Sequence, residues 1–171
     1  MRGQPAQDKV PAIPFLPNAN LFAITCIDPR VDPADLLGLD LGDAIVLRNV
    51  GGRVTAPVLE EVAYISYLVE TKAPAGSPWF ELAVIHHTDC GSGLLADERL
   101  RHDFAARTGA DQAALARRRA VLDPAETVRA DVALLRASEH LSERIRVSGH
   151  VYDVKTGLIS TIVPAATTEE R

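Results

Sequence analysis

Cysteine, long apolar runs and an excess of positive charge are all scarce or missing in this sequence. Its 171 residues include only two cysteines, and 18 lysine and arginine residues stand against 23 aspartate and glutamate residues. Two cysteines cannot build the framework of a disulfide-dense secreted module. A mildly acidic chain also lacks the basic field that holds a phosphate backbone, so we expect no nucleic-acid partner.

No stretch of the sequence approaches the roughly 20 consecutive apolar residues of a membrane-spanning helix. The first 20 residues contain four prolines and no unbroken apolar run, which argues against a secretory signal. We therefore expect a soluble, cytoplasmic protein with no membrane partner, whose cysteines remain thiols. Such thiols serve as core residues, as nucleophiles or as metal ligands.

Apolar runs alternate along the chain with segments of helical periodicity. Residues 21–26, 44–47 and 82–85 are short, nearly continuous apolar runs, the pattern of strands buried on both faces. In residues 55–71, apolar residues recur mostly at three- and four-residue steps, which predicts an amphipathic helix. This alternation predicts an α/β fold with a mostly parallel central sheet flanked by helices.

Capping residues mark where two of the predicted helices begin. Asp32 followed by Pro33 is typical of an N-cap and a first-turn proline, and predicts a brief helix. Asp123 and Glu126 fall as a capping box requires, within charge-rich helical sequence at roughly residues 94–141.

A chain of this length is usual for one domain. Residues 145–154 and 158–163 are interpreted as two closing strands at the C-terminus. We expect a single α/β domain over residues 21–163 and a short C-terminal tail over 164–171. Residues 1–20 are predicted to form an extended arm, because their spaced prolines prevent a helix.

Both cysteines lie at or just past the carboxyl end of a predicted strand, which is the edge where ligands bind in open parallel sheets. If the first and third strands are neighbours, Cys26 faces the loop that carries His87 and Cys90. Two thiolates and one imidazole are ligands that a tetrahedral Zn²⁺ accepts with one position left over. An open fourth position is typical of catalytic zinc, because a bound water can become a nucleophile. The alternative is two buried structural cysteines, with His87 as a hydrogen-bonded loop residue.

Asp28 and Arg30 favour the catalytic interpretation. In extended backbone, which Pro29 favours at Asp28, residues two apart point to the same face, so the carboxylate and the guanidinium can pair beside Cys26. Arg30 can then hold Asp28 away from the metal, where the carboxylate accepts a hydrogen bond from zinc-bound hydroxide. The alternative for this pair is a surface salt bridge that contributes little.

Three motifs resemble the signatures of the β-class carbonic anhydrases, in the same order along the chain. They are Cys-Ile-Asp-Pro-Arg at 26–30, Arg-Asn-Val-Gly-Gly at 48–52 and His-Thr-Asp-Cys-Gly at 87–91. The closing segment 149–157 is similar to the final strands of that family, and the doubled histidine resembles its small prokaryotic-type branch. The resemblance covers roughly residues 20–163.

The resemblance implies a zinc lyase that reversibly hydrates carbon dioxide to bicarbonate and a proton. It implies the zinc ligands Cys26, His87 and Cys90. Asp28 and Arg30 become the catalytic pair that gates and orients the fourth ligand, and Asp28 is itself the candidate fourth ligand of a closed state. Gly91 lies where backbone amides approach the substrate. The family also implies a homodimer, often paired further into tetramers.

The sequence departs from the family pattern at its beginning. Residues 17–20 stand where many members carry a glutamine that binds substrate, and the proline-rich arm cannot be the helical arm of other members. Two alternatives remain for the function. One is hydrolysis of carbonyl sulfide or carbon disulfide by the same fold and zinc site. The other is a non-catalytic structural or binding module in which Asp28 closes the zinc site permanently.

Overall fold

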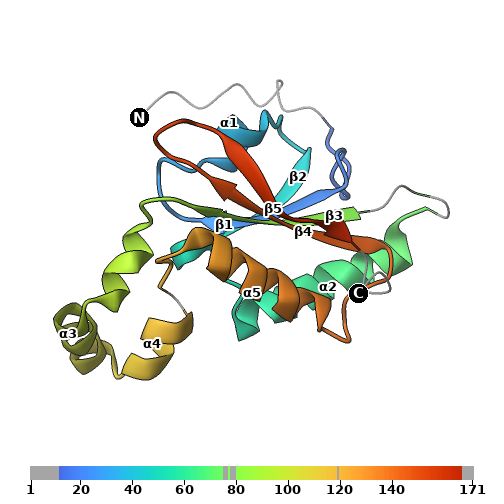
Figure 1. Cartoon of the computed structure of the whole chain (residues 1–171). Helices are drawn as coiled ribbons and strands as arrows, with labels where there is room; N and C mark the ends of the chain where they lie inside the picture. Colours follow the sequence, from blue (N-terminus) through green and yellow to red (C-terminus); the bar gives the residue numbers. More distant parts are fainter. Residues whose placement is uncertain (1–11, 75–76, 78–79, 119, 167–171) are drawn as a thin grey trace.

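A five-stranded sheet forms the centre of the molecule (Figure 1). The computed structural model describes residues 12–74, 77, 80–118 and 120–166. The strands lie side by side in the order β2-β1-β3-β4-β5, with β1 to β4 parallel and β5 antiparallel to β4. Their bounds are Leu21–Cys26 for β1, Ala44–Asn49 for β2, Phe80–His87 for β3, Ile145–Tyr152 for β4 and Ile159–Ala166 for β5. The predicted α/β fold with a mostly parallel sheet and C-terminal closing strands is confirmed.

The helices cover the two faces of the sheet unequally. Figure 1 shows α2 and α5 along one face, the short α1 on the other side, and α3 and α4 together at one end of the molecule. The helices are α1 (Pro33–Leu37), α2 (Ala56–Lys72), α3 (Glu98–Thr108), α4 (Gln112–Arg118) and α5 (Pro124–Arg136), with 3-10 turns η2 (Val50–Gly52) and η3 (Gly91–Ala96). Within the described part of the chain, no helix has the length and apolar character needed to cross a bilayer.

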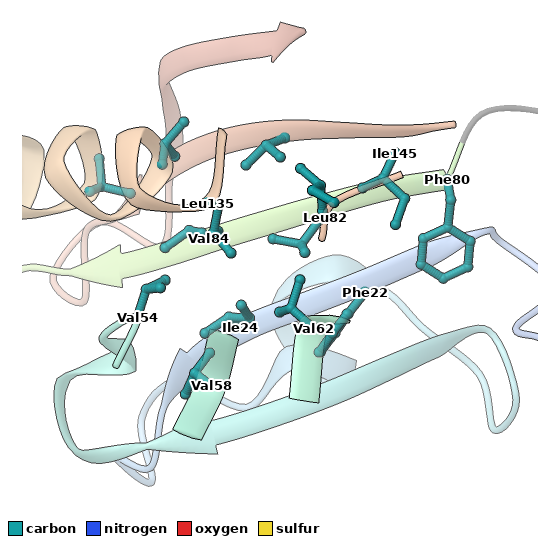
Figure 2. Close-up of a cluster of buried hydrophobic side chains, with 14 of the residues drawn as sticks. Phe22, Ile24, Val54, Val58, Val62, Phe80, Leu82, Val84, Leu135 and Ile145 are labelled. Atoms are coloured by element: carbon teal, nitrogen blue, oxygen red, sulfur yellow. The ribbon is translucent and has the colours of Figure 1, made fainter. Parts of the chain in front are cut away.

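The hydrophobic core lies between the sheet and the pair α2 and α5 (Figure 2). Phe22 of β1, Leu82 of β3 and Leu135 of α5 are almost completely buried in it. Each such side chain stabilises the fold by about 1.5–3 kcal/mol relative to an exposed position. Burial is unbroken from the second residue of β1 to its end at Cys26, which confirms a strand buried on both faces. The core therefore fixes the end of β1, where the first cysteine lies.

The two predicted helix starts are confirmed by their caps. The Asp32 carboxylate accepts the backbone N–H of Ala34 at 3.0 Å, and α1 follows directly. The Asp123 carboxylate accepts the backbone N–H groups of Ala125 at 2.8 Å and Glu126 at 3.0 Å. Each cap satisfies N–H groups that have no partner inside the helix.

The two ends of the chain are described only in part. Residues 1–11 of the predicted arm lie outside the described residues, and 12–20 contain neither helix nor strand, so the extended arm stays a prediction. Residues 167–171 of the predicted tail also lie outside the description. Strand β5 continues past the expected end at residue 163 to Ala166, because Ala166 still pairs with Val147 of β4.

Gly52 holds η2 directly against the end of β1. Its φ is 65°, and a Cβ there would lie 2.9 Å from the carbonyl carbon of Thr25 and 3.0 Å from the nitrogen of Cys26. Gly52→Ala is expected to lower the free energy of unfolding by more than about 2 kcal/mol, because this contact adds to the strain of a positive φ. Urea unfolding measures the change.

Gly109→Ala is the matched control, since Gly109 has a φ of 70° and nothing within 4 Å of an added Cβ. It is expected to show only the strain of the backbone, about 1–2 kcal/mol. Equal losses in the two variants would contradict a tight contact between η2 and β1.

Candidate metal centre

The carboxyl ends of β1 and β3 bring both cysteines and one histidine together. The two strands pair in parallel with Thr25 opposite Ile85, so the condition that the first and third strands be neighbours is met. Cys26 ends β1, His87 ends β3, and Cys90 follows in the next turn. The two sulfur atoms are 3.8 Å apart, and the three candidate ligand atoms all lie within 4.8 Å of one another.

The imidazole of His87 is oriented as a metal ligand requires. Its Nδ1 lies 2.9 Å from the carbonyl oxygen of Thr88. A carbonyl only accepts, so Nδ1 carries the hydrogen and Nε2 keeps a lone pair. Nε2 is buried and has no hydrogen-bond partner among the described residues, which is rare for a native polar atom. A metal ion at this position would satisfy it.

The two sulfurs form a hydrogen bond, in which either sulfur can be the donor. The hydrogen bond with Cys90, together with burial, raises the pKa of Cys26 to about 12, whereas the same bond lowers the pKa of Cys90 to about 6. The lowered pKa of Cys90 favours its thiolate, which is the form that binds a metal ion, and binding of a divalent cation releases the remaining protons. Two thiolates with one imidazole form a donor set that fits zinc.

Arg30 holds the carboxylate of Asp28 at the edge of this cluster. Its Nε donates to Oδ1 of Asp28 at 3.0 Å and its Nη2 donates to Oδ2 at 2.8 Å. These hydrogen bonds lower the pKa of Asp28 to about 2. Oδ2 of Asp28 is 4.0 Å from Nε2 of His87. The structure thus places the expected pair beside the candidate ligands, while its catalytic role stays a prediction.

The pair forms through a turn, whereas the sequence predicted extended backbone. The backbone N–H of Arg30 donates to Oδ1 of Asp28 at 2.9 Å, and the N–H of Val31 donates to the carbonyl of Asp28 at 3.0 Å. Pro29 takes the second position of this turn, where its fixed φ fits well. An aspartate that bonds a backbone N–H two residues ahead is a common turn contact.

Two further charged residues fix the loop after β1, and the sequence predicted neither contact. Arg48 of β2 donates to the carbonyl oxygen of Cys26 at 2.9 Å and to that of Asp28 at 2.8 Å. Asp89, from the loop between the other two candidate ligands, accepts from Nη1 of Arg30 at 2.7 Å. These contacts tie the loop after β1 to the neighbouring strand and to the loop after β3.

Gly91 begins η3 next to the candidate ligand Cys90, and it is exposed. It borders an open cavity of about 490 Å³ together with Ser92. The apolar walls of this cavity are Val50, Leu94, Leu95, Leu100, Phe104 and Leu115. A substrate contact by the backbone of Gly91 stays a prediction, but an apolar cavity lies beside that backbone.

His86 belongs to a second buried cluster that contains no cysteine. Its Nε2 lies 3.2 Å from the carbonyl oxygen of Gly52 and 3.3 Å from Oδ2 of Asp131. Arg53 donates to both carboxylate oxygens of Asp131, at 2.7 and 2.9 Å. Burial by itself would raise the pKa of Asp131, but the contacts with His86 and Arg53 lower it. This cluster holds η2 and α5 against β3.

Replacing Asp131 by asparagine is expected to lower the free energy of unfolding by about 3–5 kcal/mol, because the buried charge of Arg53 loses its partner. The folded pKa of Asp131 is lowered, so the stability from this carboxylate is fully present above the pKa of the unfolded chain. It is lost as the pH falls through the lower folded value. Urea unfolding of Asp131→Asn and of the exposed control Asp103→Asn, at several pH values, measures both effects. A deficit that stays constant down to strongly acidic pH would contradict the account.

Comparison with known proteins indicates the family. A family model described as carbonic anhydrase matches residues 21–159. β-Carbonic anhydrase 1 of Mycobacterium tuberculosis is 27% identical over 152 residues, which cover 89% of this chain and 87% of that protein. The crystal structure of carbonic anhydrase from Streptococcus mutans matches with a TM-score of 0.73 and 33% identity, covering 91% of this chain and 88% of that one.

The relatives also include proteins with a different named substrate. A carbon disulfide hydrolase of Acidianus is 26% identical over 161 residues, which cover 81% of this chain and 75% of that protein.

Proposed function

Because this chain belongs to the β-class carbonic anhydrase family, we propose that it uses zinc to catalyse the reversible hydration of carbon dioxide to bicarbonate and a proton. Cys26, His87 and Cys90 would hold the ion. The observation that carries this proposal is the buried, unpartnered Nε2 of His87 within 4.8 Å of both cysteine sulfurs.

The side chains around the metal position would supply orientation. When bound, the zinc ion supplies the Lewis acidity that makes a water molecule acidic near neutral pH. Asp28, with its pKa lowered to about 2, remains an ionised carboxylate that can only accept hydrogen bonds. Arg30 donates to both carboxylate oxygens of Asp28 and so fixes the orientation of the carboxylate beside the metal position. Arg48 donates to the backbone carbonyl of Asp28 and so fixes the position of the main chain there.

The cavity beside Gly91 suits a small uncharged substrate. Its walls are mainly apolar, and the polar side chains that line it are those of Ser92 and Thr108, next to the backbone of Gly91. Apolar walls bind a linear, uncharged molecule without having to replace strong hydrogen bonds to water. Carbon dioxide has this character, and Gly91 would present its backbone to one of the substrate oxygens.

Carbonyl sulfide and carbon disulfide are linear molecules too, and the similarity to a carbon disulfide hydrolase makes them the rival substrates. Assays of carbon dioxide hydration and of sulfide release on one purified preparation separate these functions. We expect carbon dioxide hydration. Sulfide release without hydration would overturn the substrate, and bound zinc with neither activity would favour a closed, non-catalytic module.

We also propose that the protein is a cytoplasmic homodimer. Leu94, Leu100 and Phe104, which line the cavity beside Gly91, are also 63%, 40% and 44% exposed, and a second copy packed on this apolar surface would bury it and close the open side of the cavity. Light scattering should give twice the chain mass of 18.4 kDa, and a single-chain mass would contradict the dimer. Cys26 and Cys90 form no disulfide, which supports a reducing compartment, and cell fractionation tests this location.

A further inference from the structure

Ser92 lies between the candidate ligand Cys90 and the segment that joins α4 to α5. Its Oγ is 3.2 Å from the sulfur of Cys90, and the backbone N–H of Val121 donates to the same Oγ at 3.2 Å. Ser92 is only 6% exposed. An N–H group can only donate, so Val121 occupies one lone pair of the hydroxyl and the hydroxyl hydrogen stays available for the sulfur, which can only accept when Cys90 is a thiolate.

The segment that carries Val121 is itself held in place. The carbonyl oxygen of Ala120 accepts from Nη1 of Arg53 at 3.3 Å, within the buried cluster around Asp131. The carbonyl oxygen of Val121 would lie 3.1 Å from a Cβ at Gly93, so the loop after Cys90 packs closely against this segment. These contacts hold the oxygen of Ser92 between Val121 and the sulfur of Cys90.

We propose that Ser92 is a positioning residue, whose hydroxyl donates a hydrogen bond to the thiolate of Cys90 and thereby orients this ligand and strengthens its hold on the metal. The inference rests on the proposed function only in taking Cys90 as a metal ligand. Outer hydrogen bonds of this kind are worth about 10–100-fold in metal affinity. A hydrogen bond to sulfur also draws electron density from it, which changes the energy of charge transfer from thiolate to metal.

Ser92→Ala is the test, and Ser66→Ala is its matched control. Ser66 is also buried, and its hydroxyl accepts a backbone N–H, that of Ser142 at 2.6 Å, but it lies on α2 and bonds no ligand sulfur. Chelator competition should show zinc affinity about 10–100-fold weaker in Ser92→Ala. The thiolate charge-transfer band of the cobalt-substituted protein should shift in Ser92→Ala. Ser66→Ala should match the wild type in both measurements.

A second pair of variants guards against a simple loss of packing. Ser92→Thr and Ser92→Val have nearly the same shape and differ in the hydroxyl, so the threonine variant should keep the wild-type band while the valine variant shifts it. Unchanged affinity and spectrum in Ser92→Ala, or identical spectra in the threonine and valine variants, would overturn this inference alone. Failure of the wild type to bind zinc or cobalt would overturn the proposed function as well.

Discussion

Asp28→Ala is expected to lower the rate of carbon dioxide hydration by about 10²-fold or more while the protein keeps its zinc, because misplacing a reacting group by about 1 Å can cost about that much. Asp28 is not one of the three candidate ligand residues, and Arg30 holds its carboxylate to one side of them. Its removal therefore takes away the group that orients the reacting water but leaves the ligands. Stopped-flow hydration rates together with zinc analysis measure both quantities.

Asp35→Ala is the control for this variant, because Asp35 is an exposed carboxylate on the nearby helix α1. It should show the hydration rate and the zinc content of the wild type. Wild-type activity in Asp28→Ala would contradict a catalytic role for Asp28. Loss of zinc in the same variant would make Asp28 a ligand.

Cys90→Ala is expected to lose the metal itself. A thiolate bound directly to zinc contributes more than an outer hydrogen-bond partner, so zinc affinity should fall by well over about 100-fold, and hydration activity should fall with it. Chelator competition and elemental analysis of the purified variant measure the loss. The fold should persist, because Cys90 lies in the turn after β3 and outside the hydrophobic core.

His102→Gln serves as the comparison for the cysteine variant. His102 is an exposed histidine on α3 whose ring contacts Gln112. Its replacement therefore tests whether losing a potential metal-binding side chain away from the cluster weakens zinc binding. It should bind zinc as the wild type does. Retained zinc in Cys90→Ala would refute the ligand assignment.

The strands and the three candidate ligands could be predicted because both depend on short stretches of sequence. A strand buried on both faces needs a continuous apolar run, and residues 21–26 and 82–85 have one. Cys26 and His87 end two such strands. Bringing these two residues together required only one further condition, that β1 and β3 be neighbours. The structure meets that condition.

The pairing of Asp28 with Arg30 was predictable, but the shape of its backbone was not. Proline favours extended backbone in the residue before it and also favours the second position of a turn. Here Pro29 occupies that second position, so the chain turns after Asp28: the side chain of Asp28 accepts the N–H of Arg30, and its carbonyl accepts the N–H of Val31. Those two hydrogen bonds are formed only in the turn.

The supporting contacts depend on how distant segments pack, so local patterns do not contain them. Arg53 and Asp131 are 78 residues apart and meet because α5 lies against the sheet. The contact of Ser92 with Val121 spans 29 residues and requires the chain to return after α4. Arg48 is part of a recognisable motif, but its contact with Cys26 follows from the pairing of β2 with β1.

Titration of zinc into the metal-free protein, followed by the rate of carbon dioxide hydration, tests the central claim most directly. The account predicts that activity rises in proportion to added zinc and levels off at a single ion per chain, held by Cys26, His87 and Cys90. Full activity without zinc, or no activity once that single site is filled, would contradict it.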